Sequence, residues 1–189
     1  MLNFFRDNSR ILSKLLSNQF GAAFFSVMML LAIPDTSTTL GLVSGIFCVI
    51  FLAFLNHVVL WEDGASCRIR ADAGREKYNP LKGLYLILTA SIPNFVLAIL
   101  CALGAFLSTE IGWGWTSALY KFSNVLLRFW EAMYVRILQA IGGTNPYLWL
   151  IAPVPVILLG FISYWLGLAN CRAAGVFSGP KTEKVKKKR

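Results

Sequence analysis

The sequence has little charge and few of the side chains that most enzymes use in catalysis. Only 14% of its residues are Asp, Glu, Lys or Arg, whereas a soluble domain carries about a quarter. It contains one histidine, His57, and four cysteines that form no C-x-x-C pair and have no histidine beside them. We therefore expect no zinc site and no redox-active dithiol.

Motifs for nucleotide, metal and acyl-transfer chemistry are also missing. The patterns G-x-G-x-x-G, G-x-x-x-x-G-K-[ST] and H-E-x-x-H do not occur. A serine triad has no suitable base, because the single histidine falls inside an apolar run. We expect no cofactor, no metal and no enzymatic activity.

Apolar residues are abundant and gathered into long runs. Hydrophobic residues make up 57% of the chain, the mean hydropathy is +0.62, and a run of about 20 residues is long enough for a helix to cross a membrane. The pattern predicts an all-α polytopic membrane protein with about four transmembrane helices. We expect residues 1–170 to form one helical transmembrane domain and residues 171–189 a basic cytoplasmic tail. The four spans are expected at about 15–33, 40–61, 83–107 and 147–169.

A fifth helical pattern covers residues 116–141 and has a polar stripe. The stripe consists of Ser117, Lys121, Asn124, Arg128 and Glu131. It predicts an amphipathic helix lying in the outer interface, and the alternative is a span that turns its polar face into the bundle. Arg128 and Glu131 are spaced so that they can pair on one helix face.

The distribution of basic residues predicts the topology. If the chain starts in the cytoplasm and crosses four times, every lysine and arginine except Lys121, Arg128 and Arg136 lies on the cytoplasmic side. The positive-inside rule favours this arrangement. We therefore expect a multi-pass protein of the cell membrane with both N- and C-termini in the cytoplasm.

The net charge of +9 is better explained by anionic lipid than by nucleic acid, because the basic residues flank the expected spans. We expect the lipid bilayer to be the partner of these residues, through anionic headgroups at the cytoplasmic face. The candidate contacts are Arg68, Arg70, Arg75 and Lys77 in the loop after the second span, and Lys186, Lys187 and Lys188 in the tail.

A few polar residues fall inside the expected spans and are candidates for function. Asn94 follows Pro93, which predicts a bent helix, and a broken helix at mid-membrane can mark a transport site. The alternative is a proline kink stabilised by a packing contact. Asn56 and His57 lie about one turn from Trp61, where water can satisfy them. Arg128 and Glu131 complete the candidate set.

The loop fragment Asp63–Arg68 resembles part of the signature of CDP-alcohol phosphotransferases, D-x-x-D-G-x-x-A-R. Asp63, Gly64 and Arg68 match that signature. The leading aspartate of the family would be residue 60, which is a leucine, and Cys67 replaces the alanine. The two metal ions that such a signature holds need several oxygen ligands, so these departures exclude the family.

Three functional hypotheses remain. The first is an accessory or structural subunit that packs with a larger membrane assembly, through a protein partner or as a homo-oligomer. Strips of small residues support it, because they let helices approach closely. The second is a small oligomeric transporter or channel component using Asn94, His57 and the Arg128–Glu131 face. The third is a membrane-bound lipid-modifying enzyme using the loop 63–76. The two strips of small residues that support the first hypothesis are Gly41, Ser44, Gly45 and Cys48 in the second span, and Ala90, Asn94, Ala98 and Ala102 in the third.

Overall fold

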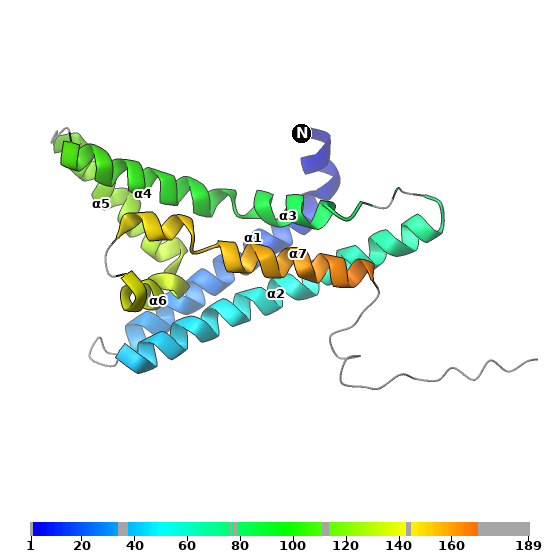
Figure 1. The fold of residues 1–189 in the computed structure, drawn as a ribbon, viewed down its shortest axis with the longest axis horizontal. Helices are drawn as coiled ribbons and strands as arrows, with labels where there is room; N and C mark the ends of the chain where they lie inside the picture. The colour runs from blue at the N-terminus through cyan, green and yellow to red at the C-terminus, as the bar shows by residue number, and fades with distance from the viewer. Residues whose placement is uncertain are drawn as a thin grey trace, which may run out of the picture.

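The apolar runs fold into helices, and the expected all-α polytopic architecture is confirmed. The computed structural model describes residues 2–33, 38–75, 77, 79–110, 114–142 and 145–169. These residues contain no strand. Four helical segments are long and apolar enough to cross a membrane. The elements, shown in Figure 1, are α1 (Leu2–Ala32), α2 (Thr38–Asp72), α3 (Lys82–Ala90), α4 (Ile92–Glu110), α5 (Gly114–Trp130), α6 (Ala132–Gly142), the 3₁₀ helix η1 (Pro146–Leu150) and α7 (Val154–Leu168).

Helix α2 is longer than the expected second span, because it continues through the first half of the predicted polar loop. At 1.5 Å per residue it measures about 52 Å, well beyond the roughly 30 Å of a hydrocarbon core. Arg68 and Asp72 form an i,i+4 ion pair of 3.6 Å that supports the added turns. Gly74, with φ of 69°, then ends the helix in the left-handed conformation that favours glycine.

The expected third span is two helices, α3 and α4, which meet at Ser91. Pro93 lies in the first turn of α4 and has no backbone N–H to donate to the preceding turn. The Oγ and the backbone N–H of Ser91 both donate to the Ile87 carbonyl, over 2.8 Å and 3.0 Å. The bend predicted from Pro93 is thus a complete interruption between α3 and α4.

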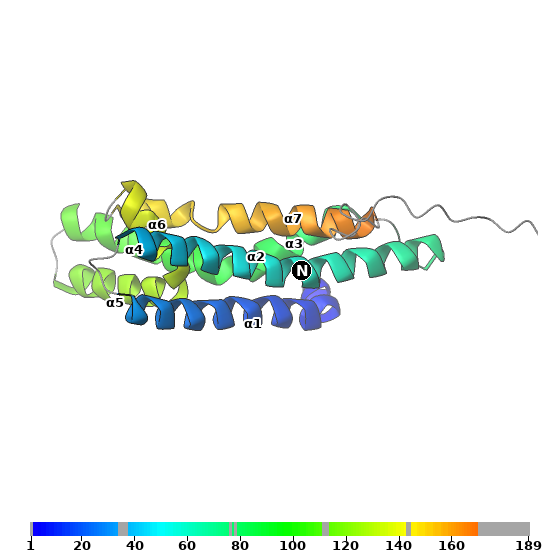
Figure 2. The ribbon, with the colours of Figure 1, turned by 90° about the horizontal axis from the view of Figure 1, so that it is seen from below.

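Helices α2 and α7 pack side by side because glycines remove the side chains at their contact (Figures 1 and 2). A Cβ added to Gly64 would collide with the Tyr164 carbonyl, and one added to Gly167 would collide with the Trp61 carbonyl. Helix α1 lies on the opposite side of α2 from α7 (Figure 2). The buried side chains between the helices form two clusters. One includes Cys48, Leu52, Ala98 and Leu127, and the other includes Leu15, Leu60, Leu86 and Tyr164.

Residues 116–141 do not form the single amphipathic helix expected from the stripe. They form α5 and α6, which are interrupted at Glu131. Helix α5 packs along α4, where Gly104 leaves room for Tyr120. Ser123, a member of the same polar side of the helix as Thr116, is buried there and donates to the Leu119 carbonyl. A small polar side chain can bury in this way, so the pattern did not reveal which face contacts protein.

The chain enters and leaves this α5–α6 segment at the same end of the bundle (Figures 1 and 2). Helix α5 runs inward from Gly114, the chain turns at Glu131, and α6 then crosses α1 and α2. Arg136 of α6 reaches the end of α1, where its guanidinium donates a 3.4 Å hydrogen bond to the Ile33 carbonyl. We call α5–α6 the re-entrant segment. The tail 171–189, with Lys186, Lys187 and Lys188, lies outside the described residues.

Candidate functional site

The two helix interruptions meet at the centre of the bundle through one hydrogen bond. Trp130, the last residue of α5, donates from Nε1 to Oδ1 of Asn94 over 2.7 Å. Asn94 is only 4% exposed. It lies about 18 Å along the helix axes from Lys82 and about 24 Å from Glu110, at 1.5 Å per residue. Asn94 is therefore deep in the bundle, and its partner comes from the re-entrant segment.

Glu131 lies at the turn between α5 and α6 and is fully buried. Neither oxygen of its carboxyl group has a hydrogen-bond partner among the described residues. Burying a carboxylate without a partner is costly, so such a group marks either a functional position or a protonated side chain. The structure thus buries an acidic side chain for which the described part of the chain supplies no hydrogen-bond donor.

Arg128 does not pair with Glu131, contrary to the expectation from their spacing. Its side chain is exposed on α5, whereas Glu131 is buried where the helix stops. The Arg128 Nε donates a 3.1 Å hydrogen bond to Asn124 Oδ1. Among the described residues, no carboxylate lies within ion-pair distance of Arg128. The two charged groups face in different directions because the chain turns at Glu131.

A small polar cavity lies next to the Asn94 contact. It is lined by polar groups from four helices and the α3–α4 break, namely Gln19, Asn56, Ser91, Asn94 and Tyr134, together with apolar side chains. Asn56 accepts a 3.3 Å hydrogen bond from Asn18, while Nε2 of the buried Gln19 has no partner among the described residues. The cavity measures about 10 Å³, room for about one water molecule. Pockets for organic ligands are larger, about 300–1,000 Å³.

His57 is not part of this centre, although it follows Asn56 in the sequence. Its Nδ1 lies 2.9 Å from Ser163 Oγ, on α7. Ser163 already donates to the Leu159 carbonyl over 2.6 Å, so its oxygen is the acceptor for the imidazole N–H. This assigns the proton of a neutral His57 to Nδ1. The structure therefore uses His57 to join α2 to α7.

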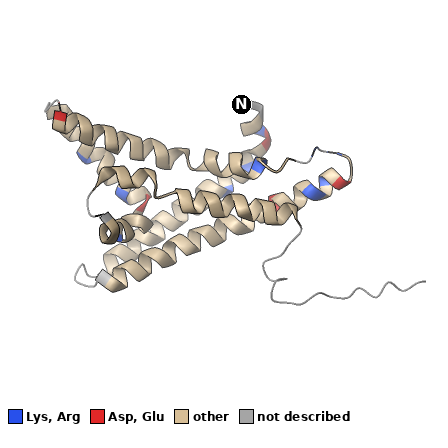
Figure 3. Cartoon of the chain, viewed as in Figure 1, with Lys and Arg blue, Asp and Glu red and all other residues tan. Residues whose placement is uncertain are grey.

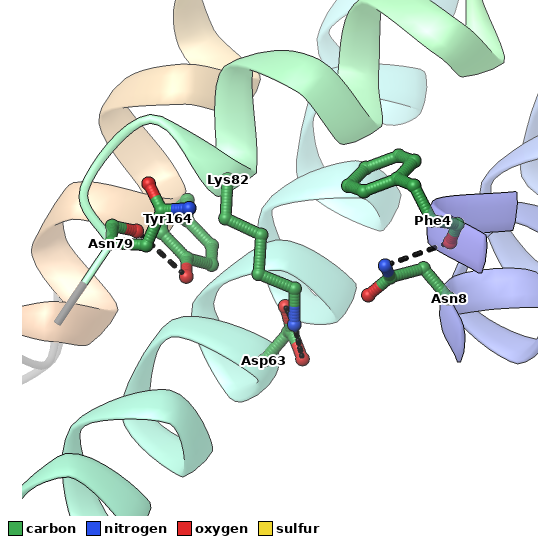
Figure 4. A network of polar contacts seen from close by, with 6 residues as sticks. All are labelled: Phe4, Asn8, Asp63, Asn79, Lys82 and Tyr164. Carbon is green, nitrogen blue, oxygen red and sulfur yellow. Dashed lines mark hydrogen bonds and ion pairs between the residues drawn. The ribbon is translucent and has the colours of Figure 1, made fainter. Parts of the chain in front are cut away.

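A second group of polar side chains lies where α1, α2 and α3 meet, at the end of the bundle away from the re-entrant segment (Figure 4). Lys82 Nζ lies 3.1 Å and 3.4 Å from the two oxygens of Asp63. Asp63 and Lys82 are 8% and 17% exposed. Nearby, the Tyr164 hydroxyl donates to the Asn79 carbonyl over 3.4 Å. The sequence analysis did not find this ion pair, because it treated Asp63 as part of a loop.

The four loop candidates for lipid contact differ in their surroundings. Arg68 is engaged within the protein, since its guanidinium donates a 2.9 Å hydrogen bond to the Leu168 carbonyl and also faces Asp72. Arg70 and Lys77 line a cavity beside Asp63. Arg75 is exposed at the end of α2. In Figure 3 the blue segments of the ribbon, which mark lysine and arginine, gather at this end, and a few also mark the re-entrant segment.

The outward face of α5 carries charge in an otherwise apolar surface. Phe122, Val125 and Phe129 are 65%, 66% and 42% exposed. Lys121 and Arg128 are exposed among them. We call these five residues the α5 face.

Comparison of the chain with known protein families, with curated proteins and with solved structures gives no match.

Proposed function

We propose that this protein is an accessory or structural subunit that packs against a partner protein inside the membrane. The observation that carries the proposal is the position of Arg128 on the exposed α5 face. A hydrophobic surface suits lipid, but a guanidinium deep within it does not. A partner protein that covers this face would supply the acceptors that lipid tails lack.

The depth of Arg128 makes this argument quantitative. Its side chain reaches back to Asn124, which lies about 15 Å along α5 from Gly114 at 1.5 Å per residue. This is half of a hydrocarbon core of about 30 Å. An arginine at the centre of a transmembrane helix costs about 2.5–3.5 kcal/mol on insertion scales. A partner that accepts its hydrogen bonds would recover part of that cost.

The partner is expected to be a different protein rather than a second copy. A second copy would need an acidic side chain on its own surface at the depth of Arg128. The described acidic residues are at the two ends of the bundle, except Glu131, which is fully buried. A partner helix with its own carboxylate at this depth meets the requirement.

The orientation in the membrane is also proposed. The end that contains Asp63 and Lys82 is assigned to the cytoplasm, and so are both termini. Support comes from the many described lysines and arginines at that end, against Lys121, Arg128 and Arg136 in the re-entrant segment. The α5–α6 segment then enters from the outer face.

Copurification after mild detergent extraction tests the accessory function. We expect a stoichiometric partner to copurify with the wild-type chain and to be lost from Arg128→Leu. Lys121→Leu is the matched control, because it removes the same charge from the same face about 10 Å closer to the outer end. Retention of the partner by Arg128→Leu, or recovery of the wild-type chain alone, would contradict the proposal.

A second candidate function is a transport component for protons or small cations. The observation that favours it is the unpartnered carboxyl of Glu131 beside two interrupted helices, an arrangement that transporters use at mid-membrane. The cavity of about 10 Å³ is too small for an organic solute. Flux of protons or sodium into liposomes, lost in Asn94→Leu, would support transport. Flux that Asn94→Leu leaves unchanged would count against it.

The third hypothesis, a lipid-modifying enzyme, gains no specific support. Asp63 and Asp72, the carboxylates that it would use, each face a basic side chain of the protein, Lys82 and Arg68. Lipid turnover assays of Asp63→Asn and Asp72→Asn test it, and unchanged turnover in both variants removes it.

A further inference from the structure

The small polar cavity beside Asn94, here called the central cavity, contains a buried hydrogen-bond donor that needs an acceptor. Gln19 of α1 lines this cavity and is 7% exposed. Its Nε2 atom is buried and has no hydrogen-bond partner among the described residues. Burying an amide without a hydrogen bond costs free energy. A hydrogen-bond acceptor bound in the cavity would therefore stabilise the protein.

Polar side chains on the other walls of the central cavity can bind the same ligand. They are Asn56 of α2, Ser91 at the α3–α4 break, Asn94 of α4 and Tyr134 of α6. The Oδ1 atoms of Asn56 and Asn94 each accept one hydrogen bond within the protein. A carbonyl oxygen has two lone pairs, so each of them can accept a second hydrogen bond. A ligand that accepts from Gln19 thus finds acceptors for its own hydrogens on α2 and α4.

The size of the central cavity and the neutral side chains around it select water as the ligand. The volume of about 10 Å³ corresponds to one water molecule. None of the described residues that line the cavity carries a charged side chain. A cation would therefore be buried without a carboxylate, and an anion without a lysine or arginine. Water can accept one hydrogen bond from Gln19 and donate two, and a buried water typically makes about three.

We propose that the central cavity is a binding site for one water molecule, which accepts a hydrogen bond from Gln19 Nε2 and donates to the amide oxygens of Asn56 and Asn94. The water joins α1 to Asn94, the residue that also accepts from Trp130. The contact that holds the re-entrant segment is thereby extended to α1 and α2. The site does not depend on the accessory function, because the α5 face is exposed whereas the central cavity lies among buried side chains.

Radiolytic footprinting of the purified full-length chain in detergent tests the site. A short X-ray pulse converts water into hydroxyl radicals, and a radical formed from a bound water oxidises the side chains beside it. Tyr134 lines the cavity and is 5% exposed, whereas its neighbour Met133 is 1% exposed and is not part of the lining. Methionine is readily oxidised, so its position rather than its chemistry protects it. In the wild-type chain we expect oxidation at Tyr134 and none at Met133.

Gln19→Leu removes the donor and keeps a side chain of similar size. We expect the oxidation of Tyr134 to fall severalfold and the Tm to fall, because the water loses its partner on α1. Ser26→Ala is the matched control. Ser26 is also a buried polar residue of α1, but its hydroxyl donates to the Ala22 carbonyl over 2.7 Å. This variant should leave the oxidation of Tyr134 unchanged.

Several results would overturn the proposal. One is the absence of oxidation at Tyr134 in the wild type, and another is equal oxidation at Met133, which would show that bulk solvent reaches α6. Unchanged oxidation of Tyr134 in Gln19→Leu, or an equal loss in Ser26→Ala, would overturn it as well. So would a higher Tm in Gln19→Leu, because removing a buried donor that has no partner stabilises a protein. If Gln19→Leu does not fold, Gln19→Met takes its place, and the wild-type contrast between Tyr134 and Met133 decides without a variant.

Discussion

Trp130 and Asn94 hold the two helix interruptions of the protein together through a 2.7 Å hydrogen bond. Trp130 ends α5, and Asn94 lies in the first turn of α4, just after the α3–α4 break. The contact therefore fixes how deeply the re-entrant segment enters the bundle. The contact also fixes the orientation of the residues on either side of Trp130. Glu131 is buried, whereas Arg128 faces outward.

Removing the indole N–H tests the importance of that contact. Trp130→Phe keeps an aromatic ring but leaves Oδ1 of the buried Asn94 without a donor. We expect the free energy of unfolding to fall by about 1–3 kcal/mol, the cost of an unsatisfied buried polar group. Trp165→Phe is the control, because Trp165 is 53% exposed and should change stability little. Equal effects of the two substitutions on thermal unfolding in detergent would contradict the assignment.

The unpartnered carboxyl of Glu131 predicts an asymmetric response to substitution. Glu131→Gln preserves the shape and removes any charge, so we expect a chain that folds with a Tm near that of the wild type. Glu131→Lys places an obligatory cation in the same buried position and should prevent folding or cost several kcal/mol. If Gln destabilised the protein as much as Lys, the carboxylate would have to make an ionic contact that this account lacks.

The glycines between α2 and α7 predict a steric effect. Gly64→Ala and Gly167→Ala place a Cβ against backbone of the opposite helix, which cannot move aside easily. Each should separate the helices and lower the Tm. Gly21→Ala is the matched control, because nothing lies within 4 Å of its added Cβ, and Ala is favoured over Gly in a helix by about 1 kcal/mol. A gain in Tm for all three variants would show that α2 and α7 are not in close contact.

The proposed orientation predicts which positions react with a membrane-impermeant thiol reagent. Single cysteines at Ala140, at the outer end of α6, and at Ala73, beyond α2, are placed in a chain without its natural cysteines. Both parent residues are exposed. In intact cells we expect labelling at position 140 and none at position 73 until the membrane is opened. The reverse pattern would invert the orientation.

The sequence predicted the apolar helices well, because their length and composition follow from the thickness of the membrane. It underestimated α2, since Glu62–Asp72 was treated as a loop on polarity alone although its residues are compatible with a helix. It predicted that Pro93 disturbs the third span. No glycine or proline lies at Glu131 to indicate a helix break in the sequence. The re-entrant segment was therefore not predicted, because it depends on the packing of α5 against α4.

The sequence predicted which candidate residues are polar within the bundle, but it did not predict their contact partners. Asn94 and Asn56 were singled out for being polar within apolar runs, and both line the central cavity. His57 was grouped with them, but its partner Ser163 is 106 residues away and belongs to another helix. The pairing of Arg128 with Glu131 assumed a continuous helix. Long-range contacts of this kind leave no periodic pattern in one sequence.

The accessory function depends most directly on what covers the α5 face. A photo-crosslinking amino acid at Val125, which is 66% exposed and one turn from Arg128, reports this in intact membranes. The same probe at Leu158, 55% exposed on α7, is the control for contact with lipid. We predict a crosslink from position 125 to one specific protein, and from position 158 to lipid alone. Crosslinks to lipid alone from both positions would contradict the account.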